Sequence, residues 1–135
     1  MESKHSIWML RGALMFLPLL LAGSTVQRAL AQSFSNEITL ENRSGKDALV
    51  KLVGPSPRTV SVRNDGKETV RVGPGTYYIL VRYGASRGRY TYSRGQTFTV
   101  DQTGASYSVI TISLHTVVGG NYQSRPILGD EFDRQ

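Results

Sequence analysis

The sequence predicts an all-β fold, an antiparallel sandwich of about seven to eight strands, preceded by an N-terminal signal peptide. Short runs rich in Val, Ile, Thr and Tyr recur at roughly 8–12-residue spacing, with Gly, Pro, Asn and Asp turns between them. No amphipathic helical pattern is visible beyond the first third of the chain. The 135 residues suit one domain, and the absence of cysteine excludes both disulfides and thiolate metal sites.

The first 31 residues have the three parts of a secretory leader in the required order. Lys4 and Arg11 supply positive charge, residues 12–22 are an apolar run, and Ala29-Leu30-Ala31 is a small-residue cleavage site. The alternative is a membrane anchor, but a spanning helix needs about 20 apolar residues, and this shorter run also contains Pro18. We therefore expect residues 1–31 to be removed as a signal peptide, called the leader below.

Cleavage between Ala31 and Gln32 defines the expected organisation of the chain. Residues 32–116 are expected to form the β-sandwich domain, and residues 117–135 an irregular C-terminal segment. Export places the protein outside the cytoplasm, secreted or in the periplasm. The formal net charge of +6 falls to +4 when the leader takes three basic residues and one acidic residue with it. This excess is too small and too scattered to predict a nucleic-acid partner.

Each expected strand rests on its own local pattern. Residues 36–42 alternate polar and apolar, whereas residues 47–53 are apolar on both faces and belong deeper in the sheet. Asp65-Gly66 is a hairpin turn signal, so residues 58–63 and 67–72 are expected to pair with each other. The further strands are expected at residues 76–83, 89–93, 96–100 and 105–114.

The central strand, residues 76–83, follows a Gly73-Pro74-Gly75 turn and is rich in Tyr, Ile and Val. Pro74-Gly75, Tyr77 and Ile79 resemble the Pro-Gly-x-Tyr-x-(Ile/Val) turn and strand of small bacterial extracytoplasmic modules. These are the PEGA-type domains and the carboxypeptidase regulatory-like, or transthyretin-like, domains. The resemblance implies an immunoglobulin-like or transthyretin-like sandwich that acts as a non-catalytic accessory or binding module.

One cluster of basic and aromatic residues is a candidate binding face. Tyr rings stack on sugars, and Arg pairs with carboxylate or phosphate, so this cluster suits an acidic polysaccharide, an anionic headgroup or an acidic protein. The alternative is cross-strand packing in which Arg stems cover the rings. The cluster comprises Arg82, Tyr83, Arg87, Arg89, Tyr90, Tyr92 and Arg94.

The residues required for catalysis or for a metal site do not come together in the sequence. Beyond the leader, His115 is the only histidine, and no Gly-x-Ser-x-Gly motif accompanies it. Asp130, Glu131 and Asp133 form a short acidic tail with too few ligands for calcium. We therefore expect no enzymatic activity, no cofactor and no metal.

Two functional hypotheses follow from these patterns. The first is a secreted or periplasmic binding module for a protein or an anionic glycan at the cell surface. The second is a structural protein that assembles through its sheet edges or its C-terminal segment. The sequence leaves the ligand and the oligomeric state open.

The leader predicts a defined N-terminus for the exported protein. When the full-length sequence is expressed in a secreting bacterial host, the exported protein should begin at Gln32, because Ala29 and Ala31 occupy the small-residue positions that the protease reads. N-terminal sequencing and intact mass measure this directly. An exported protein that still carries Met1 or Trp8 would contradict the prediction.

Overall fold

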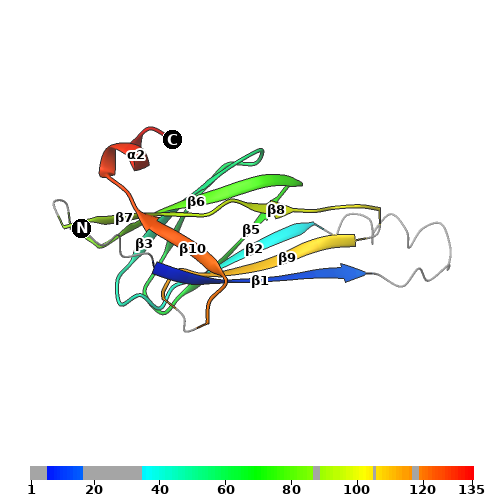
Figure 1. Ribbon diagram of the computed structural model, residues 1–135, viewed down its shortest axis with the longest axis horizontal. Helices are drawn as coiled ribbons and strands as arrows, with labels where there is room; N and C mark the ends of the chain where they lie inside the picture. The colour runs from blue at the N-terminus through cyan, green and yellow to red at the C-terminus, as the bar shows by residue number, and fades with distance from the viewer. Residues whose placement is uncertain (1–5, 17–34, 87–88, 105, 117–118) are drawn as a thin grey trace.

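The computed structural model describes residues 6–16, 35–86, 89–104, 106–116 and 119–135 of the chain (Figure 1). These residues confirm the all-β character, with ten strands and one short helix among them. The strands are β1 (Ser6–Phe16), β2 (Asn36–Glu41), β3 (Ala48–Val53), β4 (Arg58–Val62), β5 (Lys67–Val72), β6 (Gly75–Tyr83), β7 (Thr91–Gly95), β8 (Phe98–Val100), β9 (Ser106–Ser113) and β10 (Tyr122–Pro126), and the helix is α2 (Gly129–Asp133).

The predicted two-sheet sandwich of seven to eight strands is wrong. The strands form a single mixed sheet in the order β4-β3-β6-β7-β10-β1-β9-β2-β5, with β8 paired to β6. The pairing of β2 with β9 is parallel, and the other pairings are antiparallel. The sheet curls until it is nearly closed, so that its two halves face each other across the core (Figure 1).

Strand β1 is the physical reason for the difference. Residues Ser6 to Trp8 pair with β10, and residues Met9 to Phe16 pair with β9, so one strand joins the two halves of the sheet. These residues belong to the segment that the sequence assigns to the leader. The expected cleavage site at Ala31 and Gln32 lies outside the described residues, and removal of the leader stays a prediction.

The predicted hairpin of residues 58–63 and 67–72 is also wrong, although its turn forms. Asp65 has a φ of 59°, and the amide of Gly66 donates to the carbonyl of Arg63 at 2.9 Å. Beyond the turn the strands separate, because β4 pairs with β3 over five residues and β5 pairs with β2 over six. The turn therefore connects the two outermost strands of the curled sheet.

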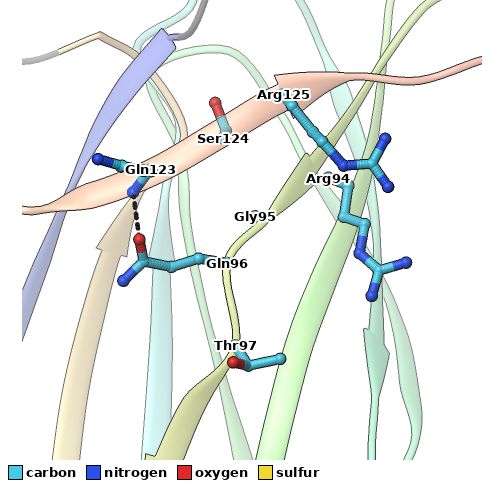
Figure 2. A pocket seen from close by; sticks show the side chains of 7 residues that line it. All are labelled: Arg94, Gly95, Gln96, Thr97, Gln123, Ser124 and Arg125. Atoms are coloured by element: carbon cyan, nitrogen blue, oxygen red, sulfur yellow. Dashed lines mark hydrogen bonds between the residues drawn. The ribbon is translucent and has the colours of Figure 1, made fainter.

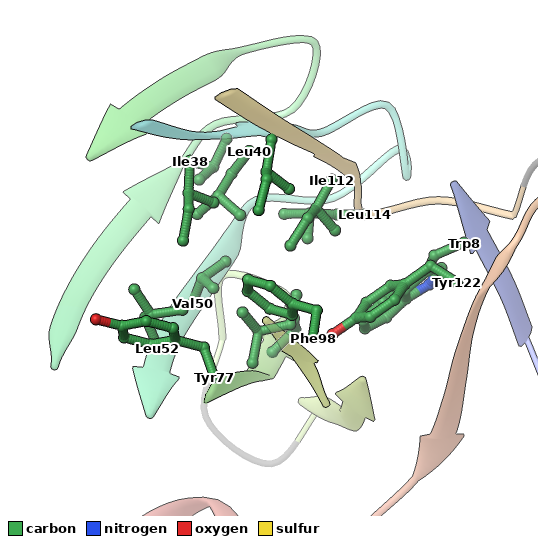
Figure 3. Close-up of a cluster of buried hydrophobic side chains, with 14 of the residues drawn as sticks. Trp8, Ile38, Leu40, Val50, Leu52, Tyr77, Phe98, Ile112, Leu114 and Tyr122 are labelled. Atoms are coloured by element: carbon green, nitrogen blue, oxygen red, sulfur yellow. The ribbon is translucent and has the colours of Figure 1, made fainter. Parts of the chain in front are cut away.

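The core lies between the two halves of the sheet (Figure 3). Strands β2 and β9 contribute Ile38, Leu40 and Ile112 from one half, and β3, β6 and β8 contribute side chains from the other. The expected inward face of β6 is confirmed, since its alternate residues from Tyr77 to Tyr83 are buried. Trp8 closes one side of this core and stacks on Tyr122, with ring centroids 5.7 Å apart.

The Gly-Pro-Gly turn before β6 is held by the first buried residue of that strand. The hydroxyl of Tyr77 donates to the carbonyl of Gly73 at 2.8 Å and accepts from the amide of Ser56 at 3.2 Å. Gly75 has a φ of 144°, and a Cβ there would lie 2.6 Å from Pro55. A residue other than glycine is therefore excluded by both backbone conformation and space.

The C-terminal segment, which was expected to be irregular, carries two regular elements. Strand β10 pairs with β1 on one side and with β7 on the other, and α2 follows it against β6 and β7. Two aromatic residues of this segment, Tyr122 and Phe132, are buried, whereas Leu128 is 78% exposed. Within the described residues, no helix has the length and apolar character needed to cross a membrane.

Asn42 connects the two outermost parts of the sheet. Its buried side-chain amide donates to the carbonyls of Lys46 at 2.7 Å and Val62 at 3.0 Å, and its backbone amide donates to the carbonyl of Gly66. Its side-chain oxygen also accepts from the amide of Ser44. The Asn-x-Ser sequence at this position therefore forms a turn in which Asn42 is buried and Arg43 is exposed.

Replacing Asn42 should show how much its hydrogen bonds contribute to the stability of the fold. Asn42→Ala removes the side-chain donor to the buried Val62 carbonyl and one of two side-chain donors to the Lys46 carbonyl, so we expect the free energy of unfolding to fall by about 2 kcal/mol. Asn64→Ala, which removes an acceptor for the Gly45 amide at an exposed site, is the matched control and should cost less than about 1 kcal/mol. Urea denaturation followed by circular dichroism measures both, and equal losses would contradict the role given to Asn42.

Candidate functional site

The structure separates the predicted basic and aromatic cluster into two faces of the sheet. Arg82 lies opposite Tyr92 in the β6–β7 register, and both are on the outer face. Tyr83 faces the core instead, where its hydroxyl donates to the carbonyl of Leu114 at 2.5 Å, and burial raises the pKa of its phenol far above the usual value. Arg89 is exposed in the loop before β7, and Arg87 lies outside the described residues.

The outer-face members of the cluster pack with one another and with α2. The guanidinium carbon of Arg82 lies 4.2 Å from the Tyr90 ring centroid and 5.9 Å from that of Phe132. The rings of Tyr92 and Phe132 are 5.4 Å apart, and Arg94 lies 4.1 Å from the centroid of Tyr78. These are cation–π and ring contacts of the kind that the packing alternative requires.

Helix α2 covers this face through one aromatic side chain. Phe132 is 1% exposed and Leu80, which points to the same outer side as Arg94 in the register, is fully buried. Neither residue belongs to the main core, so they form a second apolar contact on the outside of the sheet. The Lys51 ammonium lies 4.4 Å from the Phe132 ring and donates to the Phe132 carbonyl at 2.9 Å.

Glu131 adds ion pairs to the contact between α2 and the outer face of the sheet. Its carboxylate accepts from Arg125 at 2.9 Å and from Arg94 at 3.3 Å. Slight desolvation raises the pKa of the Glu131 carboxyl, but the hydrogen bonds from Arg125 and Arg94 outweigh it and lower the pKa below its usual value. An acidic helix end thus already occupies the face that the sequence assigned to an acidic ligand. A binding role for this face stays a prediction, and its packing role is visible in the structure.

A pocket between β7 and β10 shares these arginines. It has a volume of about 300 Å³, and Figure 2 shows Arg94 and Arg125 projecting from its rim while Gln96 bonds to the amide of Gln123. Because Glu131 pairs with both arginines, half of their positive charge is compensated within the protein.

A second pocket, called the basic pocket below, lies where β2 and β9 end. Its volume is about 350 Å³. Three of its lining residues are basic, and none of the described residues that line it carries a carboxylate. Thr and Ser hydroxyls add further hydrogen-bonding groups, so the pocket offers both charge and hydrogen bonds to an anion. The lining comprises Trp8, Arg43, Ser44, Lys46, Tyr83, Thr91, Ser93, Leu114, His115 and Thr116.

The parallel pairing of β2 and β9 creates the basic pocket. Glu41 lies opposite Ser113 at the ends of these strands, and the amide of Leu114 donates to the carbonyl of Glu41 at 2.8 Å. The turn that carries Arg43 and Lys46 therefore begins beside the segment that carries His115. The structure shows no ion pair from Arg43 or Lys46 to any described carboxylate.

His115 has an unused hydrogen-bonding atom in this pocket. Its Nδ1 is buried and has no hydrogen-bond partner among the described residues, although buried polar atoms are nearly always paired. No Asp or Glu joins it in the pocket lining, and no group of three or more metal-ligating side chains occurs in the described part of the chain. The arrangement suits recognition of an anion better than acid–base or nucleophilic chemistry.

The sequence analysis missed the basic pocket and most of the outer-face contact. Arg43 and Lys46 lie in a polar stretch after the first expected strand and His115 follows the last one, and only the parallel pairing brings them together. Lys51 and Phe132 had a visible signal, since Lys51 alternates outward from the buried side of β3 and Phe132 is a lone aromatic in an acidic tail. Comparisons of the chain with protein-family models, with curated proteins and with solved structures find no match.

Phe132 should be the residue on which docking of α2 depends. Phe132→Ala removes a buried ring that contacts Tyr92 and Lys51, so we expect a loss of about 3 kcal/mol in the free energy of unfolding and faster amide exchange over residues 129–133. Leu128→Ala, in the exposed residue before α2, is the control and should stay within about 0.5 kcal/mol of the parent. Denaturant unfolding and hydrogen–deuterium exchange measure the two effects, and unchanged exchange in Phe132→Ala would refute this role.

Proposed function

We propose that the protein is an exported, non-catalytic binding module that holds a carboxylate-bearing ligand, an acidic glycan or an acidic protein segment, in the basic pocket. The observation that carries the proposal is the set of Arg43, Lys46 and His115 around one concave site without a lining carboxylate. Arg43 and Lys46 carry positive charge without an ion pair to a described carboxylate, which favours an anionic partner. The leader pattern of residues 1–31 supports encounter with that partner outside the cytoplasm.

The pocket also has the mixed character that recognition sites usually have. Leu114 and the Tyr83 ring provide apolar surface that does not depend on β1, while Thr91, Ser93 and Thr116 provide hydroxyl groups near the basic residues. A few polar groups around an apolar surface fix the orientation of a ligand as well as its charge. This combination supports a sugar acid or an acidic peptide over an isolated inorganic anion.

A second candidate function, assembly through sheet edges, is favoured by one specific observation. Among the described residues, Met9 to Phe16 of β1 pair with β9 on one side only, and Leu14 and Met15 are nearly half exposed there, an edge that exists while residues 1–31 are retained. An unpaired edge with exposed apolar side chains is a site for strand pairing between molecules. Concentration-dependent mass in light scattering without any ligand would favour assembly, and a monomer at all concentrations would count against it.

Neutralising the basic pocket should weaken binding of an acidic ligand. Oligogalacturonate and poly-glutamate are the two probes, and uncharged oligogalactose is the neutral control. We expect the Arg43→Gln and Lys46→Gln double variant to bind the preferred acidic probe about tenfold more weakly, because charge-assisted hydrogen bonds are lost. Isothermal titration calorimetry measures the affinity, and the probe that binds more tightly identifies the ligand class.

Two controls separate pocket recognition from general charge attraction. Arg58→Gln removes one positive charge, as the single variant Arg43→Gln does, but from an exposed residue on β4 outside the basic pocket, and should leave the affinity within about twofold of the parent. His115→Gln keeps a hydrogen-bonding side chain but changes its geometry, and should weaken binding without changing stability. Equal effects of the Arg58 and Arg43 variants, or no binding of either acidic probe, would refute the proposal.

A further inference from the structure

Removal of the leader would take away the strand that lies between β9 and β10. Strand β1 lies between β9 and β10 and is antiparallel to both, so β9 and β10 run in the same direction on either side of it. If residues 1–31 are removed, the paired edges of Ser106–Ser113 and Tyr122–Ser124 both lose their partner. Backbone groups of sheet edges that lose a strand are a template for pairing with another one.

The buried side chain of Trp8 fills a site between β9 and β10 that removal of the leader would empty. Trp8 is 2% exposed, stacks on Tyr122 and lines the basic pocket beside Leu114 and His115 (Figure 3). Removal of the leader takes this indole away and leaves a cavity lined by the ring of Tyr122 and the side chain of Leu114. An apolar cavity flanked by two open strand edges fits an extended chain that carries a large aromatic side chain.

We propose that removal of the leader opens a groove between β9 and β10 that binds an extended segment of a partner protein, with an aromatic side chain in the place of Trp8. The groove is called the β1 groove below. The segment enters antiparallel to both flanking strands, as β1 does. The inference rests on the proposed export and leader cleavage, but not on the ligand of the basic pocket.

The geometry of β1 specifies which backbone groups of the segment are needed. The amide of Leu10 donates to the side chain of Asn121 at 2.7 Å, on the β10 side, so it points away from β9. Successive amides of a strand point in opposite directions, and the amides of Arg11 and Ala13 therefore face β9. The amides of Gly12 and Leu14 face the opposite edge of β1. Among the described strands, none pairs with that edge after Trp8.

The test uses the exported protein and a peptide with the sequence of residues 6–16, extended by lysines for solubility. Trp8 is the only tryptophan in the chain, so an exported protein that begins at Gln32 has none, and the peptide supplies the only indole signal. We expect saturable binding with a blue shift of the indole emission as the ring enters the groove. A peptide with Trp8→Ala should bind about 30-fold more weakly, as is typical of buried aromatic anchors.

Backbone methylation provides a matched pair of peptides. N-methylation at Arg11 and Ala13 removes hydrogen bonds to β9 and should abolish measurable binding. N-methylation at Gly12 and Leu14 adds the same groups on the open side and should leave most of the affinity. Since the Trp8→Ala peptide has no indole, calorimetry measures the affinities of all the peptides.

The N-terminus of the exported protein decides first whether the β1 groove is open. An exported protein that retains residues 6–16 overturns the inference, because its own β1 fills the groove. Cleaved protein that binds both methylated peptides equally, or binds neither the parent peptide nor its variants, also overturns it. Cleaved protein that is unfolded alone but gains β structure when the parent peptide is added supports it, and protein that stays unfolded with the peptide does not. Failure here leaves the proposed anion binding intact, because that function is measured separately by the Arg43 and Lys46 variants.

Discussion

The parallel ladder between β2 and β9 is the constraint on which the rest of the molecule depends. It joins a strand near residue 40 to one near residue 110, and it carries Ile38 and Ile112 into the core. Because the two strands run in the same direction, the segments that follow them leave at the same end of the sheet. That end becomes the basic pocket, and β1 and β5 complete the sheet on either side of the ladder.

Two buried asparagines hold β2 in this central position. Asn42 ties the end of β2 to the carbonyl of Val62 in β4, and Asn36 ties its start to the carbonyl of Val72 in β5 and to the amide of Ser108 in β9. Both side chains pair their polar atoms although they are almost fully buried. Satisfied buried amides of this kind favour one register over its alternatives.

Charge in the protein is distributed unequally between its two candidate surfaces. On the outer face, the single carboxylate of Glu131 pairs with both Arg94 and Arg125, and Phe132 packs beside Lys51. At the basic pocket, no described carboxylate forms an ion pair with Arg43 or Lys46, although the charge of Arg43 helps to lower the pKa of the nearby Glu41 carboxyl. The difference separates a surface that has an internal partner from one that is open to an external partner, and it explains why the pocket supports the proposed function better than the cluster that the sequence indicated.

The first strand has one observed role and one expected role. The apolar run that predicts a secretory leader begins within β1, whose residues Met9 to Phe16 pair with β9 over eight positions. Both roles require an apolar segment with few charges, so a single sequence pattern is compatible with each. Pairing in the sheet is observed, whereas removal by a protease and the β1 groove that it would open are proposals.

The sequence by itself determined most of the strands between residues 36 and 114, because alternation of apolar and polar residues depends only on which face of each strand is buried, whereas β1 and β10 were not expected. The expected positions of β2, β3 and β6 agree with the structure. Turn residues likewise act locally, as the formation of the Asn64-Asp65-Gly66 turn shows. Strand order was decided only by tertiary structure: β4 and β5 separate after a good hairpin turn, because β4 pairs with the preceding strand β3 and β5 pairs with the more distant β2. The basic pocket has the same origin, since Arg43 and His115 are far apart in the chain and meet only when β2 and β9 pair in parallel.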